Sequence, residues 1–459
     1  MNVFLIISDT FRYDNLLEDT AMPVRTPHLD AFKKRAVSLS GLRTGSFPTI
    51  PHRTELISGR FNWPWYPWKD LTEQVCLPQV LASTGDYVTQ LLCDCPHLFK
   101  ASFQKRFHAA QALRGQESDL PFLRMNHEIK EVMPREKTRT GKHFMGRTLV
   151  DVHSWCNRDW QGERDTFPPR TAELACRWLE ENGQHQHLFL WVDFFDPHEP
   201  WDPPEYMVSR YDPDYAGTPM LHPNYGKASD YSEEELRNLR AHYCAEAELV
   251  DRWVGRILQK IDDLQLWDDS LVLFTSDHGT SLGEHNRTGK TNINERDNRI
   301  WPMYPENACI PFLISGPGLM AGEEMDFLAQ PADILPTILE LLALDVDLPG
   351  GIHGKSFASH LRGKTTGEHR DLVVCSPHLR LDENGQPKGT DTPMVYTQEW
   401  GYVPIGVDQQ PELYRIIDDR YAETNLIQDH GDVAKKLHEQ FVAWLKELDA
   451  PETALAPFV

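Results

Sequence analysis

A threonine lies between two prolines in the stretch from Ser46 to Arg60, and its surroundings suit nucleophilic chemistry. Pro51 can occupy the first position of a helix that ends at Gly59, which puts the Thr49 hydroxyl at the helix N-terminus. Unpaired N–H groups and the positive end of the helix dipole favour an attacking oxygen and a bound anion there. Arg53, about one turn further on, could contact the same anion with its guanidinium group. The alternative is that Thr49 only caps the helix, because threonine is a common cap residue.

Acids and histidines follow four apolar runs of the sequence. Carboxylate oxygens and imidazole nitrogens are ligands of divalent cations. In a parallel sheet the carboxyl ends of the strands meet at one edge, where ligands gather. The pattern therefore predicts a shared rim that binds a divalent cation. The residues at these four ends are Asp9, Asp94 with His97, Asp196 with His198, and Asp277 with His278.

The apolar runs themselves indicate the elements that position these side chains. Runs without polar alternation are typical of strands buried on both faces. Helical segments lie between them, and the longest one opens with a capping box at Ser232 and Glu235. Strands that alternate with helices predict an α/β fold with a large, mainly parallel sheet sandwiched by helices. The runs are residues 3–8, 87–92, 188–195, 270–275 and 311–315.

The length of the chain predicts more than one unit. A chain of 459 residues is too long for one ordinary core, so we expect a large domain and a smaller one. We predict a catalytic domain over 1–368 and a C-terminal α+β subdomain over 369–459. Residues 100–165 are polar, rich in Arg and His and weakly periodic, which indicates an insertion near the mouth of the site.

The composition is that of an ordinary soluble globular protein with an acidic excess. The formal net charge of −23 argues against nucleic acid as a partner, because phosphates favour basic surfaces. No apolar run approaches the ~20 residues of a membrane span, and the first residues have no basic region of a signal peptide. The eight cysteines are scattered, so we expect them to be reduced. These features predict a cytoplasmic protein without a membrane partner.

Four motifs, in this order, resemble those of the sulfatase family of the alkaline-phosphatase superfamily, and the resemblance covers nearly the whole chain. The family's opening strand and acid are matched by residues 5–12. Its nucleophile signature, Cys or Ser followed by x-Pro-x-Arg and then Thr-Gly-Arg, resembles Thr49-Ile50-Pro51-His52-Arg53 and Ser58-Gly59-Arg60. Its histidine motif resembles residues 194–200, and its second metal motif resembles residues 275–279 with Lys290 after it. The tail from Glu412 is similar to the family's small C-terminal sheet and closing helix.

The resemblance implies an alkaline-phosphatase-like fold and a metal-dependent ester hydrolase. It implies one divalent metal ion, with Ca²⁺ as the first expectation and Mg²⁺, Mn²⁺ or Zn²⁺ as alternatives. The implied metal ligands are Asp9, Thr49, Asp277 and His278. The implied contacts to the ester's anionic oxygens or its leaving group come from Arg53, His97, His198 and Lys290. Asp94 shares the rim with His97, so we expect it to bind substrate as well.

The departures from the family pattern bear on the chemistry. Family sulfatases oxidise the signature Cys or Ser to formylglycine, and Thr49 cannot become that aldehyde. The paired acids of many members are replaced by Asp9 and Thr10, which removes one anionic ligand. Cys95 stands where many members have a lysine, two residues before His97, so one positive contact to the ester is missing.

Thr49 as nucleophile favours a phosphate or phosphonate ester as the substrate. A threonine ester can be cleared only by water attacking sulfur or phosphorus, and related threonine enzymes of the superfamily do this at phosphorus. A true sulfatase acting on a sulfated sugar or small molecule is the close alternative, and a non-catalytic protein that binds an anionic sugar is the third. A two-metal phosphodiesterase site is disfavoured, because it needs further His ligands where Lys290 stands. The expected partner is a small anionic ester, and a homo-oligomer is compatible with the sequence.

Overall fold

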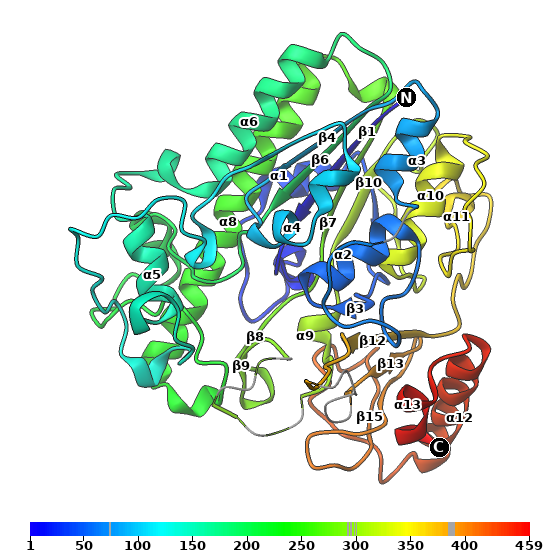
Figure 1. The fold of residues 1–459 in the computed structure, drawn as a ribbon. Helices are drawn as coiled ribbons and strands as arrows, with labels where there is room; N and C mark the ends of the chain where they lie inside the picture. The colour runs from blue at the N-terminus through cyan, green and yellow to red at the C-terminus, as the bar shows by residue number, and fades with distance from the viewer. Residues whose placement is uncertain (73–74, 292, 294–295, 298, 300, 384–390) are drawn as a thin grey trace.

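A computed structural model describes residues 1–459 except 73–74, 292, 294–295, 298, 300 and 384–390. Its centre is an eight-stranded sheet in the order β11-β2-β10-β7-β1-β6-β4-β5 (Figure 1). The middle strands pair in parallel, whereas β10 is antiparallel to both of its neighbours. The predicted α/β fold with a large, mainly parallel sheet is confirmed. The strands are β1 Asn2–Ser8, β2 Val37–Leu39, β4 Val88–Cys93, β5 Ala109–Ala112, β6 Leu188–Phe194, β7 Ser270–Ser276, β10 Phe312–Ser315 and β11 Glu324–Met325.

Helices cover both faces of this sheet, because successive side chains of each buried strand point to opposite faces (Figure 1). Val3, Leu5 and Ile7 of β1 belong to one apolar cluster, and Phe4 and Ile6 belong to the other. The first cluster includes side chains of α2 Thr49–Ser58, α3 Leu77–Ser83, α10 Ile334–Leu341 and α11 Ala358–Leu361. The second includes side chains of α1 Pro27–Lys33, α6 Phe167–Asn182 and α8 Glu233–Asp263.

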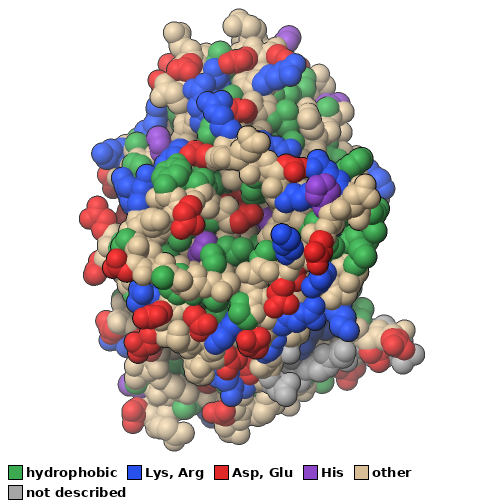
Figure 2. Space-filling view, turned by 90° about the vertical axis from the view of Figure 1, so that its left-hand side faces the viewer, with side chains coloured by type: hydrophobic (Ala, Val, Ile, Leu, Met, Phe, Trp, Pro, Cys, Tyr) green, Lys and Arg blue, Asp and Glu red, His purple; other side chains and the backbone are tan. Residues whose placement is uncertain are grey.

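The long predicted helix is α8, and its start follows the predicted chemistry. The Ser232 hydroxyl accepts from the Glu235 N–H, and the Glu235 carboxylate accepts from the Ser232 N–H. This capping box satisfies two of the helix's otherwise unpaired N–H groups. Among the described residues, no helix is long and apolar enough to cross a bilayer. Acidic and basic side chains are interspersed over the face of the molecule drawn in Figure 2.

A second sheet of five strands, in the order β15-β14-β13-β12-β3, forms most of the C-terminal part. Four of its strands are β12 Val373–Pro377, β13 Met394–Tyr396, β14 Gly401–Val403 and β15 Glu412–Tyr414, and α12 Gly431–Glu447 packs on them. The fifth, β3 Ser46–Phe47, comes from the N-terminal half and pairs in parallel with β12. The small sheet therefore holds the chain immediately before Thr49. The predicted boundary between residues 368 and 369 remains a prediction.

The segment 100–165, predicted to be an insertion, contributes one strand to the large sheet. Its strand β5 pairs in parallel with β4 at the edge of that sheet, a strand that the weak periodicity did not predict. Beyond β5 the described chain forms short 3-10 turns and then helix α5 Leu149–Cys156. One of these turns, η3 Gln116–Ser118, packs beside α5 and carries Glu117.

A buried ion pair joins the large sheet's helices to the start of the small sheet, and it gives a testable stability prediction. The Asp333 carboxylate accepts from Arg370 Nε at 2.8 Å, from Gln330 N at 2.9 Å and from Lys355 N at 2.7 Å. Burial alone would raise the pKa of Asp333, but Arg370 brings it to about 2, below the ordinary value of 3.8. This contribution to stability is therefore complete above the ordinary pKa and is lost as the pH falls toward 2.

We expect Arg370→Met to lower the free energy of unfolding by about 3–5 kcal/mol at neutral pH, because it leaves the Asp333 charge buried without its partner. The loss should shrink as the pH falls toward 2, because protonation of Asp333 removes the unpaired charge. Thermal unfolding midpoints of both proteins across this pH range measure it. Arg362→Met, which breaks the more exposed 3.8 Å pair with Glu340, is the matched control. An Arg370→Met loss that is the same at every pH would contradict the assignment.

Candidate active site

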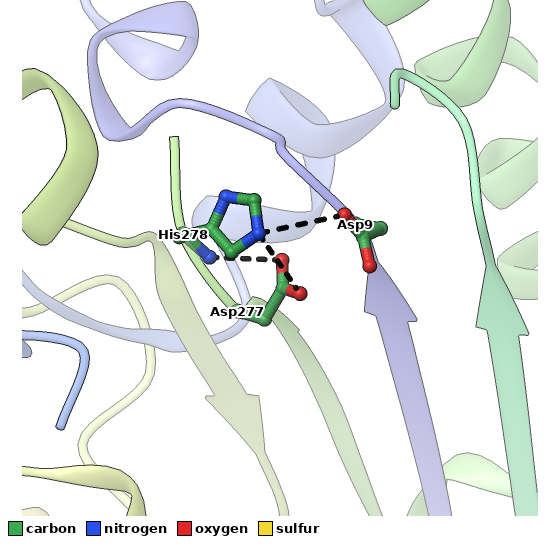
Figure 3. Close-up of side chains that lie close together, drawn as sticks. All are labelled: Asp9, Asp277 and His278. Carbon is green, nitrogen blue, oxygen red and sulfur yellow. Dashed lines mark hydrogen bonds and ion pairs between the residues drawn. The ribbon is translucent and has the colours of Figure 1, made fainter. Parts of the chain in front are cut away.

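Asp9, Asp277 and His278 converge at the carboxyl ends of two neighbouring strands (Figure 3). Strands β1 and β7 pair in parallel up to Ser8 and Ser276, so the next residues of both strands emerge side by side. His278 Nε2 lies 3.8 Å from Asp9 Oδ1 and 3.5 Å from Asp277 Oδ2. All three side chains are fully buried. The convergence that was predicted from the ends of the apolar runs is present for these three residues.

The chemistry of this cluster fits a divalent metal ion. His278 Nδ1 donates to the Gly279 carbonyl at 2.8 Å, so Nε2 carries the lone pair that faces the carboxylates. Nε2 is buried and has no hydrogen-bond partner among the described residues, and Asp9 Oδ2 has only its ion pair with Arg53 Nη1. Burial lowers the pKa of His278 to about 4, which keeps the imidazole neutral, as a ligand must be. Two carboxylates and one neutral imidazole form a usual donor set for a divalent cation.

Thr49 is the first residue of α2, and Pro48 is the N-cap. Pro51, predicted at the first position, is the third residue of the helix, so the helix begins two residues earlier than predicted. The side chain of Thr49 is buried, and the N-cap position belongs to Pro48, so Thr49 is not the cap residue. The helix ends at Gly59 in the left-handed conformation, as predicted. Arg53 Nη1 contacts the Thr49 carbonyl at 3.3 Å, Asp277 Oδ2 at 2.6 Å and Asp9 Oδ2 at 3.1 Å. One guanidinium group therefore ties the start of α2 to the metal-binding cluster.

Arg53 has a third carboxylate partner that the sequence analysis did not identify. Asp193, near the end of β6, accepts from Arg53 Nε at 2.8 Å and from Nη2 at 2.9 Å. Burial is the largest influence on the pKa of Arg53 and would lower it, but the three carboxylates raise it well above its ordinary value. The nitrogens of Arg53 thus contact protein carboxylates, whereas the predicted contact with ester oxygens remains a prediction. The sequence does contain a signal for Asp193: an acid inside an apolar run lies in a buried strand, and a buried acid needs a partner.

Lys290 and His198 lie together beside this cluster. Lys290 follows β9 Thr288–Gly289, and its Nζ donates to both carboxylate oxygens of Glu199, at 2.9 and 3.1 Å. His198 Nδ1 donates to the Glu199 carbonyl at 2.7 Å, and its ring stacks on Phe195. Burial, with the Lys290 charge next, lowers the pKa of His198 well below its ordinary value. Glu199 was visible in the histidine motif, but its partner lies 91 positions away in sequence.

His97 lies in α4 Pro96–Lys100, and its Nε2 is 2.9 Å from Glu117 Oε2. The positive charge of Lys290 also lowers the pKa of Asp9, of His278 and of Glu117, although burial is the largest influence on each of these pKa values. Lys290 therefore acts electrostatically both on the metal-binding cluster and on Glu117, the partner of His97. The structure brings seven of the predicted residues into one region: Asp9, Thr49, Arg53, Asp277, His278, His198 and Lys290. His97 is linked to this region through its contact with Glu117.

Asp94 has contacts of a different kind. Its carboxylate accepts from the Thr171 hydroxyl at 2.5 Å and from the Phe195 N–H at 2.5 Å. Burial raises the pKa of Asp94 to about 7. These contacts join the ends of β4 and β6 to α6, and the predicted role of Asp94 in substrate binding has no contact of its own to support it. Asp196, the fourth acid of the predicted rim, accepts from Gln116 Nε2 at 2.6 Å and likewise lies outside the metal-binding cluster.

Comparisons with known proteins agree with this architecture. The family model described as Sulfatase matches residues 1–344. Arylsulfatase K of Xenopus laevis is 24% identical over 494 residues, which cover 100% of this chain and 84% of that protein. Endo-4-O-sulfatase of Bacteroides thetaiotaomicron is 22% identical over 461 residues, covering 94% and 86%. The solved phosphonate monoester hydrolase of Agrobacterium radiobacter superposes with a TM-score of 0.73 at 22% identity, over 98% of this chain and 96% of that one.

Proposed function

Because the chain belongs to the sulfatase family and is an ester hydrolase of that family, we propose that it cleaves small phosphate or phosphonate esters with Thr49 as the nucleophile. The observation that supports this most is the Arg53 guanidinium, whose Nη1 contacts Asp9, Asp277 and the Thr49 carbonyl at once. The backbone of Thr49 is thereby linked to the only residues of the described chain that form a metal-binding cluster, and the proposal places its hydroxyl beside them.

The proposed cofactor is one divalent metal ion held by Asp9, Asp277 and His278, with the Thr49 hydroxyl as a further ligand. Such an ion lowers the pKa of a bound hydroxyl and offsets negative charge on ester oxygens. The carboxylates are oxygen ligands that Ca²⁺ prefers, whereas the imidazole of His278 is more usual for Zn²⁺ and other transition metals. We propose Ca²⁺ first, with Mg²⁺, Mn²⁺ and Zn²⁺ as alternatives that metal analysis of the purified protein distinguishes.

In the first half-reaction the Thr49 hydroxyl loses its proton to solvent, its oxygen attacks phosphorus, and the bond from phosphorus to the leaving alcohol breaks. Lys290 is the better placed proton donor for that alcohol, because two of its three N–H groups are used on Glu199 and one remains. His198 carries its proton on Nδ1, where the Glu199 carbonyl accepts it, so its Nε2 is an acceptor. We therefore assign proton donation to Lys290, and to His198 the orientation of the substrate or of water.

The second half-reaction is the reason for preferring phosphorus. Water must attack the phosphorylated Thr49 at phosphorus, because threonine has no geminal hydroxyl through which the product could be eliminated. Sulfate-ester hydrolysis is the second candidate, and the names of the relatives, an arylsulfatase and an endo-4-O-sulfatase, favour it. The fold does not decide between them, since a phosphonate monoester hydrolase shares it.

A panel of 4-nitrophenyl esters tests the proposal. The purified protein is assayed with its metal on the phosphate, the phenylphosphonate, the methyl phosphodiester and the sulfate. We expect at least one phosphorus ester to be cleaved with a higher kcat/KM than the sulfate, and ¹⁸O from labelled water to appear in the inorganic or phosphonate product. Faster cleavage of the sulfate would establish the second candidate. No cleavage of any ester, together with binding of an anion, would replace both with a non-catalytic binder.

A further inference from the structure

Glu117 places a negative charge beside His97, His198 and Lys290, three side chains that are expected to bind an anionic ester. Its carboxylate lies 2.9 Å from His97 Nε2 and 3.9 Å from Arg139 Nη1, and it is 14% exposed. Burial alone would raise the pKa of Glu117, but the hydrogen bond from His97 and the positive charge of Lys290 hold it well below its usual range. Glu117 is therefore ionised beside three residues that are expected to bind the ester.

The backbone fixes this carboxylate in place. Gly115, Glu117 and Ser118 have positive φ angles of 127°, 42° and 60°. Such conformations cost a non-glycine residue about 1 kcal/mol or more and persist only where the surroundings impose them. Here Gln116 Nε2 donates to Asp196 Oδ1 at 2.6 Å, and Asn157 Nδ2 donates to the Gly115 carbonyl at 3.2 Å.

The other carboxylates of the site have partners that balance their charge. Asp193 pairs with Arg53, and Glu199 pairs with Lys290. Asp9 and Asp277 supply the two negative charges that a divalent cation would balance. Glu117 differs, because its closest partner is a histidine and its contact with a permanent cation, Arg139, is long. A substrate with two negative charges would place its second charge in the field of this carboxylate.

We propose that Glu117 is a specificity-determining residue that makes the site select monoanionic esters over dianionic ones. The inference rests on the proposed function, because the ester must bind beside His97, His198 and Lys290. The favoured class then comprises phosphodiesters, phosphonate monoesters and sulfate monoesters, and the disfavoured class is the phosphate monoester dianion. A like charge ~6 Å away, at an effective dielectric constant of about 20 to 40, disfavours the second charge by about tenfold to a hundredfold.

Turnover of a matched pair of substrates tests the charge selection. Methyl 4-nitrophenyl phosphate and 4-nitrophenyl phosphate share a leaving group and, at mildly alkaline pH, carry one and two negative charges. We expect Glu117→Gln to lower the ratio of kcat/KM for the monoanion to kcat/KM for the dianion by about tenfold or more, because the dianion is cleaved faster. Glu117→Asp should keep the ratio near that of the native protein. Asp119→Asn, which removes a charge paired with Arg114 on the same segment, is the matched control and should also keep it.

A binding measurement decides the inference even if no ester is turned over. Calorimetric titration at mildly alkaline pH compares phenylphosphonate, a dianion, with benzenesulfonate, a monoanion of similar shape. We expect Glu117→Gln to strengthen phenylphosphonate binding by about tenfold or more and to leave benzenesulfonate binding within about twofold. An equal change for both anions, in either direction, would overturn the inference, since it would mean that Glu117 blocks the site or positions His97 without sensing charge. Failure of turnover with selective binding would overturn the proposed function alone.

Discussion

Thr49→Ala is expected to abolish ester hydrolysis, lowering kcat by about 10⁴-fold or more, because removal of a nucleophile leaves only the residual catalysis of binding and electrostatics. The substitution removes one buried hydroxyl at the first position of α2, and no hydrogen bond among the described residues uses that hydroxyl. The thermal unfolding midpoint should therefore change little. Initial rates on the best ester of the panel, measured with unfolding scans of the same samples, separate loss of chemistry from loss of fold.

Two further variants make the Thr49 result specific. Thr49→Ser keeps a hydroxyl and should retain most of the activity, with an intact mass that shows the serine unmodified. Thr54→Ala removes a buried hydroxyl from the same helix, four residues from the helix end, and should leave kcat within a few-fold. Acid quenching during turnover should trap a phosphorylated peptide that contains Thr49. Full activity of Thr49→Ala would rule out threonine as the nucleophile.

The part of the site that the sequence predicts best is the part fixed by strand burial. Apolar runs identify β1 and β7, and parallel neighbours end together, so Asp9, Asp277 and His278 could be grouped before any coordinates. The same reasoning grouped Asp94 with them, but Asp94 does not belong to the metal-binding cluster. Its position at the end of β4 is as expected, but the Thr171 hydroxyl and the Phe195 N–H take up its carboxylate.

The residues that sequence reasoning missed depend on contacts between distant segments. Asp193 is hidden in an apolar strand, and its meaning appears only once Arg53, 140 positions away, lies against it. Glu117 lies in a polar, weakly periodic segment whose strand β5 was also missed, because a four-residue edge strand has too few positions to show alternation. A pairing of this kind has no local signature, since it is set by tertiary packing.

Asp277→Asn is expected to lower the affinity for the divalent metal ion by more than about 100-fold, since loss of a supporting partner alone costs about 10- to 100-fold. Asp277 Oδ2 faces both His278 Nε2 and Arg53 Nη1, so the amide removes a negative charge at the centre of the cluster. The purified native protein should contain one divalent ion per chain, and the variant much less than one. Activity should fall in parallel and return partly at high metal concentration.

Asp193→Asn is the matched control for this metal-site prediction. Asp193 is as buried as Asp277 and also binds Arg53, but it lies outside the metal-binding cluster. We expect Asp193→Asn to keep its metal ion while losing thermal stability, because one partner of a buried ion pair is neutralised. Removal of the ion from the native protein with a chelator should abolish turnover and lower the unfolding midpoint, since a bound ion stabilises only the folded state. Equal metal loss in both variants would show that Arg53 and its carboxylates hold the ion as one unit, and no metal in the native protein would contradict the Asp9, Asp277 and His278 site.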